Sequence, residues 1–149
     1  MLSVGNVKEK CWREAEADYK KGLQSFASLS LEEVPDEAGD QVGRVKAVEA
    51  ARVLDRIRDR DFVIALDAKG TKFTSEEFAR YIEGVFSKGA SRYVLVIGGS
   101  HGLDVSVLSR ADLLLSFSDF TFPHQLMRII LLEQLYRAFQ IMRGTKYHK

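Results

Sequence analysis

Three short, predominantly apolar runs constrain the fold of this chain more than any other feature of its sequence. They are residues 62–66, Tyr93–Ile97 and 113–117. Each run has the length of a buried strand and is bounded by turn-forming residues. Segments with the three- to four-residue apolar spacing of helices lie between the runs. Because strands that alternate with helices form parallel sheets, the sequence predicts an α/β protein.

Weaker patterns complete a sheet of about five strands. Leu2–Val4 reads as a first strand that ends at Gly5, and residues 29–34 read as a second strand that stops at Pro35. Residues 67–70 are expected to form the turn after the central strand. A threonine followed by glutamates at residues 74–77 is typical of a helix start. Helices are expected over residues 7–26, 44–59, 74–88, 105–111 and 125–143.

Length and composition indicate one ordinary domain. The 149 residues are 46% hydrophobic and 29% charged, as in soluble globular proteins. No apolar run approaches the roughly 18–20 residues that a membrane span needs, so no membrane association is expected. The N-terminal residues lack the apolar core of a signal peptide, which predicts a cytoplasmic protein. The single cysteine, Cys11, is interpreted as an incidental thiol.

Charge is distributed unevenly along a chain whose net charge is only +1. From Leu126 onward, one acid accompanies five basic residues: Arg128, Arg137, Arg143, Lys146 and Lys149. Such a basic end fits a patch that contacts phosphates. The alternative is that part of these cations only favours the negative end of the helix dipole. Four further arginines, at positions 52, 56, 58 and 60, are interpreted as a solvated helix face, with contact to RNA as the alternative.

Two elaborate loops follow the second and third apolar runs. The first is Gly98-Gly99-Ser100-His101-Gly102, and the second extends from Phe117 to Pro123. The first loop matches neither the phosphate loop nor the dinucleotide fingerprint, and a Gly-Gly pair after a strand is often only a tight turn. Ligands nevertheless bind where the carboxyl ends of neighbouring parallel strands meet. The two loops together therefore predict a site for a small molecule.

Four strings of sequence carry a resemblance to a known family. They are VLVIGGSHGL at residues 94–103, LSFS and TFPH at residues 115–118 and 121–124, EQLYRAF at residues 133–139, and the final YHK. In this order they closely resemble the RlmH family, the bacterial pseudouridine N3-methyltransferases of large-subunit ribosomal RNA in the SPOUT class. The resemblance covers nearly the whole chain and is densest from Phe62 onward. It implies a SPOUT-type parallel sheet flanked by helices, with a C-terminal trefoil knot, in a single domain over residues 1–149.

The resemblance also implies S-adenosylmethionine as cofactor, held between three loops. The positions that match are Leu66, Gly98, Phe117, Ser118, Asp119, Phe120, Thr121 and Phe122. A glycine lets a ligand approach the backbone closely, and phenylalanines can supply apolar walls. The alternative for the three phenylalanines is plain core packing, and we expect it to apply to at least one of them.

The implied reaction is methyl transfer to N3 of a pseudouridine in helix 69 of 23S ribosomal RNA. The nitrogen must lose its proton, so a base or a cation that stabilises the anion would help. The candidates are His124, Arg128, Glu133, Arg137, Tyr147 and His148, of which we favour His124, Arg128, Tyr147 and His148. His124 could instead only cap or pack the last helix. Glu133 and Arg137, four residues apart, could form a simple helix ion pair, or they could brace the site or a subunit interface.

The tail and the last helix yield two further expectations. Gly144 should end the helix, and the five residues after it should form an exposed arm. The arm is predicted to close over the cofactor pocket of the opposite subunit, although a free terminus is ordinarily dispensable. The last helix is apolar over more than one face, which favours a homodimer, as the resemblance also implies.

Two other functions stay open on the sequence. A non-catalytic RNA- or ribosome-binding module could retain the cofactor fold, and a small flavin- or nucleotide-binding protein could share the sheet. The lack of a phosphate loop disfavours the second. No metal is expected, because His101, His124 and His148 lie far apart and no Cys/His cluster has the spacing of ligands.

Overall fold

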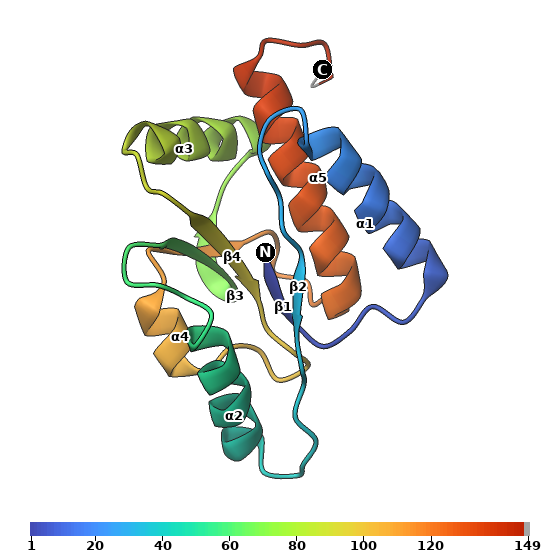
Figure 1. The fold of residues 1–149 in the computed structure, drawn as a ribbon, viewed down its shortest axis with the longest axis vertical. Coiled ribbons are helices and arrows are strands. Elements are labelled where there is room, and N and C mark those ends of the chain that lie inside the picture. The colour runs from blue at the N-terminus through green and yellow to red at the C-terminus, as the bar shows by residue number, and fades with distance from the viewer. Residues whose placement is uncertain (148–149) are drawn as a thin grey trace. The chain divides into compact units, whose positions relative to one another are not determined.

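The computed structural model describes residues 1–147, which contain five strands and five helices. The chain divides into two compact units, and each is described by itself below. The sheet unit comprises Met1–Asn6, Ser30–Lys72 and Ser91–His124. The helical unit comprises Val7–Leu29, Phe73–Ala90 and the chain from Gln125 onward. Figure 1 shows the elements of both units.

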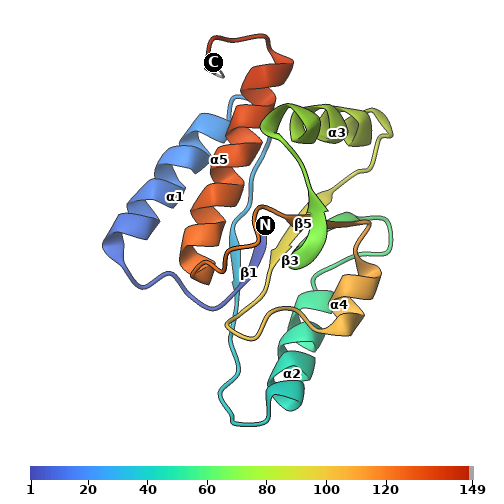
Figure 2. The same cartoon turned by 180° about the vertical axis from the view of Figure 1, so that it is seen from behind.

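A five-stranded sheet with only parallel pairs forms the sheet unit (Figure 2). Its strands are β1 (Leu2–Val4), β2 (Glu32–Val34), β3 (Phe62–Lys72), β4 (Tyr93–Ile97) and β5 (Leu113–Ser116). Their order in the sheet is β2-β1-β4-β3-β5. The predicted parallel α/β sheet is therefore confirmed, and β3 lies between β4 and β5, whose loops were predicted to form the site.

Helices α2 (Val42–Leu54) and α4 (Val105–Arg110) pack against this sheet. The core between them is rich in valine, a residue whose branched side chain suits strands. Five of its members, each at most 1% exposed, are Val4, Val34, Val63, Val96 and Val107. Burial of these side chains, at about 1.5–3 kcal/mol each, is the main stabilising contribution to the unit.

The helical unit consists of α1 (Lys10–Leu23), α3 (Ser75–Ser87) and α5 (His124–Met142), whose first residue belongs to the sheet unit. Aromatic rings join its helices. Phe139 of α5 stacks on Phe26, with ring centroids 5.1 Å apart, and on Phe86 of α3 at 5.7 Å. The predicted helix start is confirmed by a capping box in which Thr74 and Glu77 exchange side-chain-to-backbone hydrogen bonds.

The prediction that residues 67–70 form a turn after β3 is wrong. Strand β3 continues to Lys72, and Leu66 and Thr71 both pair with Leu115 of β5 across a register shift. A Cβ at Gly70 would lie 2.6 Å from the carbonyl carbon and oxygen of Leu114. The polar residues and the glycine therefore mark a bulge at which two backbones approach each other closely.

Two of the four arginines predicted to form a solvated face, Arg52 of α2 and Arg56 just beyond it, are engaged with neighbouring segments. Arg52 donates to the carbonyl of Pro35 at 3.0 Å and pairs with Glu37 at 2.6 Å. Arg56 donates to the carbonyl of Glu33 in β2 at 3.1 Å. These two side chains remain 35% and 36% exposed, but they also join the C-terminal end of α2 and the residues after it to β2 and the loop that follows β2.

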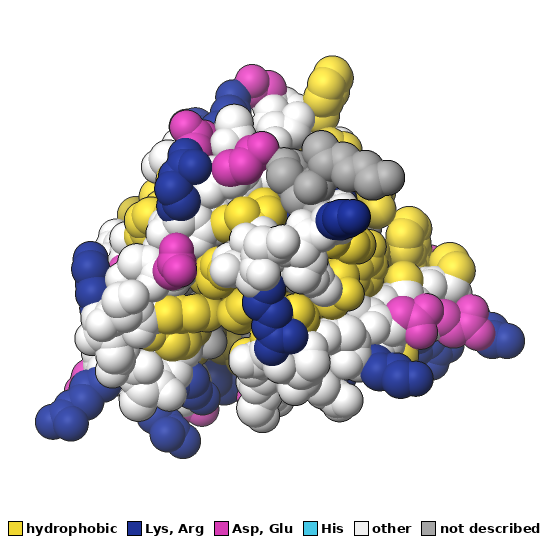
Figure 3. All heavy atoms as spheres, turned by 90° about the horizontal axis from the view of Figure 1, so that it is seen from above, with side chains coloured by type: hydrophobic (Ala, Val, Ile, Leu, Met, Phe, Trp, Pro, Cys, Tyr) yellow, Lys and Arg dark blue, Asp and Glu magenta, His cyan; other side chains and the backbone are white. Residues whose placement is uncertain are grey.

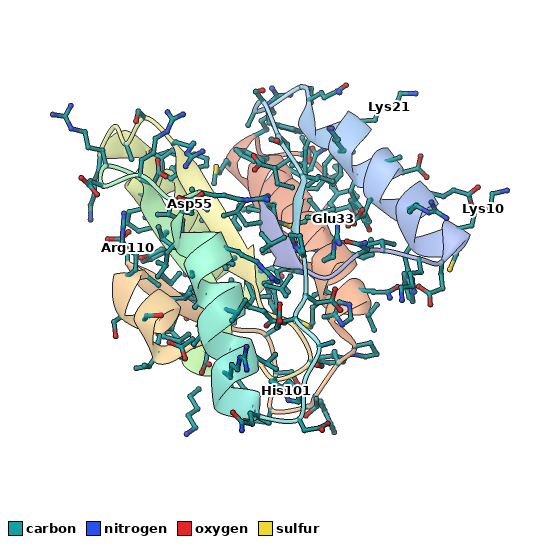
Figure 4. The ribbon with its side chains drawn as sticks, turned by 60° about the horizontal axis from the view of Figure 1, so that its bottom comes forward. Lys10, Lys21, Glu33, Asp55, His101 and Arg110 are labelled. Atoms are coloured by element: carbon teal, nitrogen blue, oxygen red, sulfur yellow. The ribbon has the colours of Figure 1, made fainter. Side chains whose placement is uncertain are left out.

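A polar network closes the sheet where β3 and β4 begin. The Asp61 side chain is 1% exposed and accepts two hydrogen bonds from Arg92, with Nε at 3.0 Å. The hydrogen bond from Arg92 is the largest of several effects that hold the pKa of Asp61 below its usual value. Arg110 donates to the Asp61 carbonyl at 2.9 Å. Figure 4 shows Asp55 and Arg110 near the end of α2 that is remote from His101.

Candidate functional site

The loop after β4 is a tight turn held by its own backbone. The amide of Gly102, at φ +73°, donates to the Gly99 carbonyl at 3.0 Å. A Cβ at Gly98 would lie 2.9 Å from backbone atoms of both Gly102 and Leu103. Glycine at position 98 is therefore required by the fold of the loop itself. This corrects the sequence-based reason, which gave that space to a ligand.

A buried carboxylate lies against the same loop. Glu49 of α2 is 5% exposed, and its Oε1 accepts a hydrogen bond from the amide of Glu37 at 3.1 Å. A Cβ at Gly99 would lie 3.2 Å from Oε2 of Glu49 and 3.1 Å from Val4. Glu49 was not among the residues singled out from the sequence.

The loop after β5 is ordered by its serines. The Ser116 hydroxyl donates to the Ser118 carbonyl at 3.2 Å, and the Phe120 amide donates to the Ser118 hydroxyl at 3.0 Å. Asp119 pairs with Nζ of Lys72, the last residue of β3, at 2.5 Å. Because both partners are largely exposed, this pair contributes little stability, but it joins the loop to the neighbouring strand.

All eight residues predicted to bind the cofactor belong to the sheet unit: Leu66 lies on β3, Gly98 in the loop after β4, and the other six in the loop after β5. Leu66 is half-buried within β3 rather than at its end. Phe117 and Phe122 are also half-buried, whereas Phe120 is 81% exposed. None of the three phenylalanines is a buried core residue, in contrast to the expectation for at least one of them. The exposed Thr121 completes the loop.

Two of the predicted catalytic residues differ sharply in their surroundings. His124, the first residue of α5, is half-buried, and its imidazole lies 3.4 Å from where a Cβ of Gly5 would stand. Arg128 is 1% exposed, and its Nε pairs with Oε1 of Glu16 at 2.5 Å within the helical unit. Arg128 therefore acts first as a structural cation between α1 and α5.

Tyr147 packs on α5. Its hydroxyl makes a long hydrogen bond of 3.5 Å to Glu133, and its ring meets that of Tyr136 edge-on at 5.0 Å. The Arg137 guanidinium lies 5.0 Å from the Tyr147 ring centroid and pairs with Glu133 at 2.6 Å, which confirms the predicted ion pair. Burial, and next the negative charge of Glu133, raise the pKa of Tyr147. The phenol therefore stays protonated at neutral pH. His148 and Lys149 lie outside the described residues.

The end of α5 follows the predicted pattern. Gly144 has φ +65°, its amide donates to Ile141 at 2.9 Å, and the amide of Thr145 donates to Gln140 at 3.1 Å. This pair of hydrogen bonds is a Schellman motif, so the predicted glycine cap is confirmed. The three described residues beyond it are exposed, although Tyr147 contacts α5 instead of projecting freely.

Three of the five cations expected to contact phosphates have partners inside the helical unit. Besides Arg128 and Arg137, Arg143 donates to the Ser25 carbonyl at 3.0 Å and lies 4.0 Å above the Phe26 ring. These contacts weaken the case for a phosphate patch built from the last helix.

Other kinds of site find less support in the part of the chain that the structure describes. Among residues 1–147, no group of three or more His, Cys, Asp or Glu side chains could hold a metal ion. Within the same residues, no helix combines the length and apolar character of a membrane span. A polar hollow of about 210 Å³ is lined by residues 37–41, Arg44 and Val45, and it contains none of the predicted site residues.

Comparison with known proteins identifies the family. A family model described as "Predicted SPOUT methyltransferase" matches residues 1–148. The chain belongs to the SPOUT methyltransferase family. It is 50% identical over 155 residues to a protein of Bifidobacterium adolescentis named "Ribosomal RNA large subunit methyltransferase H", which covers 100% of this chain and 98% of that protein. The predicted family resemblance is thus confirmed.

A solved structure supports the fold alone. It is "The structure of a probable methylase family protein from Haemophilus influenzae Rd KW20", with a TM-score of 0.56 and 16% identity. The match covers 99% of this chain and 69% of that one. The SPOUT-type α/β class is therefore confirmed, and the trefoil knot stays a prediction.

Proposed function

We propose that this protein is an S-adenosylmethionine-dependent RNA methyltransferase that modifies N3 of a pseudouridine in helix 69 of large-subunit ribosomal RNA. The observation that carries the proposal is the full-length, 50% identical relative named as a large-subunit rRNA methyltransferase. The structure supports it with ordered loops after the adjacent strands β3, β4 and β5. A ribosomal substrate would also account for the predicted cytoplasmic location.

The residues in the sheet unit fit this cofactor. The backbone of the loops after β4 and β5 offers amides and carbonyls for an adenine edge, and half-buried Leu66, Phe117 and Phe122 offer apolar surface. The carboxylate of Glu49, next to Gly99, has a sign opposite to that of the cofactor's cationic groups. We propose that Gly98 and residues 117–122 hold the cofactor.

The bound cofactor would supply an activated methyl group, so the protein must position the RNA and manage one proton. His124 is the proposed proton acceptor because a ring nitrogen of an imidazole can take up a proton. Protonated Tyr147 would act as a hydrogen-bond donor or a stacking surface for a base, together with His148. Arg128, paired with Glu16, would assist by positioning α5 rather than by touching the RNA.

We also propose that the protein is a homodimer. Many apolar side chains of α5 are only half-buried in the single chain, including Ile129, Ile130, Ile141 and Met142. Figure 3 shows hydrophobic side chains that reach the surface among charged ones. A second copy would cover such side chains and would bring a second tail to the site.

Transfer of a labelled methyl group tests the activity. Ribosomes that lack the modification, incubated with methyl-labelled S-adenosylmethionine and the protein, should become labelled in helix 69. Ribosomes that already carry the modification are the matched control. A protein that binds ribosomes without transferring label would instead support the non-catalytic binding module. Free ribosomal RNA as a third substrate shows whether the assembled particle is required.

Deletion of residues 147–149 tests the proposed role of the tail. The deletion should leave the oligomeric state and most cofactor affinity intact, because the cofactor residues lie in the sheet unit, but should remove most methyl transfer. Light scattering, calorimetry and the labelling assay measure the three properties. Wild-type transfer by the truncated protein would refute the role.

A further inference from the structure

Glu49 is a buried carboxylate that the described part of the chain leaves incompletely paired. The residue is 5% exposed, and its one hydrogen bond among the described residues is the 3.1 Å bond from the Glu37 amide to Oε1. No cationic group within residues 1–147 forms an ion pair with it. Polar groups that are largely withdrawn from water need hydrogen-bond partners, so the acceptor position left at Oε2 can serve a ligand.

Of the two cations that lie three residues from Glu49 on the same helix, Lys46 and Arg52, the second is committed elsewhere. Arg52, one turn after Glu49, pairs with the Glu37 side chain at 2.6 Å and donates to the carbonyls of Pro35 and Asp36. Arg52 therefore binds the loop between β2 and α2 and does not pair with Glu49. The loop provides Glu49 with one hydrogen bond, from the backbone amide of Glu37.

The carboxylate faces the glycine loop after β4. A Cβ at Gly99 would lie 3.2 Å from Oε2 and 3.4 Å from Oε1. Gly99 is half-buried, so the missing side chain leaves the carboxylate approachable at the loop that carries Gly98. Any other residue at position 99 would place its Cβ against Oε2.

We propose that Glu49 is the counter-ion for the α-ammonium group of the bound cofactor. The inference rests on the proposed function and deepens it by naming the residue that recognises the methionyl end. An ammonium group can donate a charge-assisted hydrogen bond to Oε2, and such bonds are roughly twice as strong as neutral ones. The sulfonium, which has no proton to donate, would gain only Coulomb attraction.

Ligand dissection separates this role from a structural one. S-adenosylhomocysteine retains the ammonium group and is not consumed, whereas 5′-methylthioadenosine lacks the amino-acid end altogether. Isothermal titration calorimetry should show that Glu49→Gln weakens S-adenosylhomocysteine binding about ten-fold or more, as expected for a hydrogen bond to a charged group. The same substitution should leave the affinity for 5′-methylthioadenosine within about two-fold of wild type, since that ligand makes no contact with Glu49.

Two further variants keep the test decisive. Glu37→Gln removes the ion pair with Arg52 but retains the Glu49 charge and the Glu37 amide, so it should bind both ligands like wild type. Gly99→Ala should weaken S-adenosylhomocysteine selectively, because its methyl group would stand 3.2 Å from Oε2. Thermal unfolding of each variant verifies that the fold persists.

The outcomes are distinguishable. Equal weakening of both ligands by Glu49→Gln would show that Glu49 only positions the loop, and unchanged binding of both would show no contact; either result overturns the inference. If the wild-type protein binds neither ligand, the proposed function itself fails, and the inference fails with it.

Discussion

Replacement of Arg128 by methionine should destabilise the helical unit severely. The Arg128 and Glu16 side chains are 2% and 11% exposed, and their charged atoms lie 2.5 Å apart. Methionine keeps most of the length of the side chain but leaves Glu16 as a buried charge without this partner. Loss of one partner of a buried pair costs about 3–5 kcal/mol. Because Glu16 retains slight exposure, we expect the lower part of that range, about 3 kcal/mol.

Urea unfolding measures this effect. Trp12, the single tryptophan, lies in α1 of the same unit, so its fluorescence reports on the perturbed packing. With an m-value of about 2 kcal/mol/M, a loss of about 3 kcal/mol lowers the midpoint by roughly 1.5 M urea. Circular dichroism should be recorded in parallel, because coincident transitions justify the two-state treatment.

The double variant Glu16→Met/Arg128→Met is the matched control. It removes both charges, so it should recover most of the lost stability. If Arg128 acts only by positioning α5, the double variant should also retain most methyl transfer. An Arg128→Met protein that unfolds at the wild-type urea concentration but no longer methylates would refute this reasoning and would make Arg128 a catalytic contact.

Four further substitutions test other parts of the structure. Asp61→Asn should cost about 2 kcal/mol at neutral pH, since it weakens hydrogen bonds to Arg92. Because folding lowers the pKa of Asp61, its ionised carboxylate stabilises the folded state at pH values above the usual carboxyl pKa. This contribution is lost as the pH falls, so the urea midpoints of the variant and the wild type should converge below about pH 4. Gly70→Ala should unfold the sheet unit, because its Cβ would stand 2.6 Å from the β5 backbone. As a control, a Cβ at Gly84 would meet no atom within 4 Å, so Gly84→Ala should raise the melting temperature through a gain in stability of about 0.8 kcal/mol. Phe120→Ala should leave stability unchanged because the side chain is 81% exposed, and an unchanged cofactor affinity by calorimetry would show that it is not a cofactor wall.

The sheet was predictable because its strongest signals are local. Tyr93–Ile97 is an unbroken apolar run between breakers, and the structure has a strand with the same bounds. The extension of β3 to Lys72 was missed because the polar residues after Leu66 resemble a turn. Only the pairing of Thr71 with β5, a long-range contact, shows that the strand resumes.

The polar contacts of the site were less predictable, because their partners lie far apart in sequence. Lys72 and Asp119 are separated by 47 positions, and nothing in either local pattern indicates that they meet. Arg56 binds a backbone carbonyl of β2, a group that every residue carries. Sequence patterns can identify which side chains are charged, but they do not show which backbone segments fold against them.

Glu49 and Arg128 nevertheless share a signal that the sequence contains. Glu49 lies four residues after Val45 and four before Val53, which are 3% and 0% exposed, so helical spacing alone places the carboxylate on the buried face of α2. Arg128 is likewise followed at helical spacing by the buried Leu131. A charge on an apolar face needs a partner, and α1 supplies Glu16 to Arg128. For Glu49 the described chain supplies one backbone amide and a glycine that leaves the carboxylate approachable. The same spacing rule thus yields a structural ion pair where the fold supplies the opposite charge, and it favours a ligand site where the fold does not.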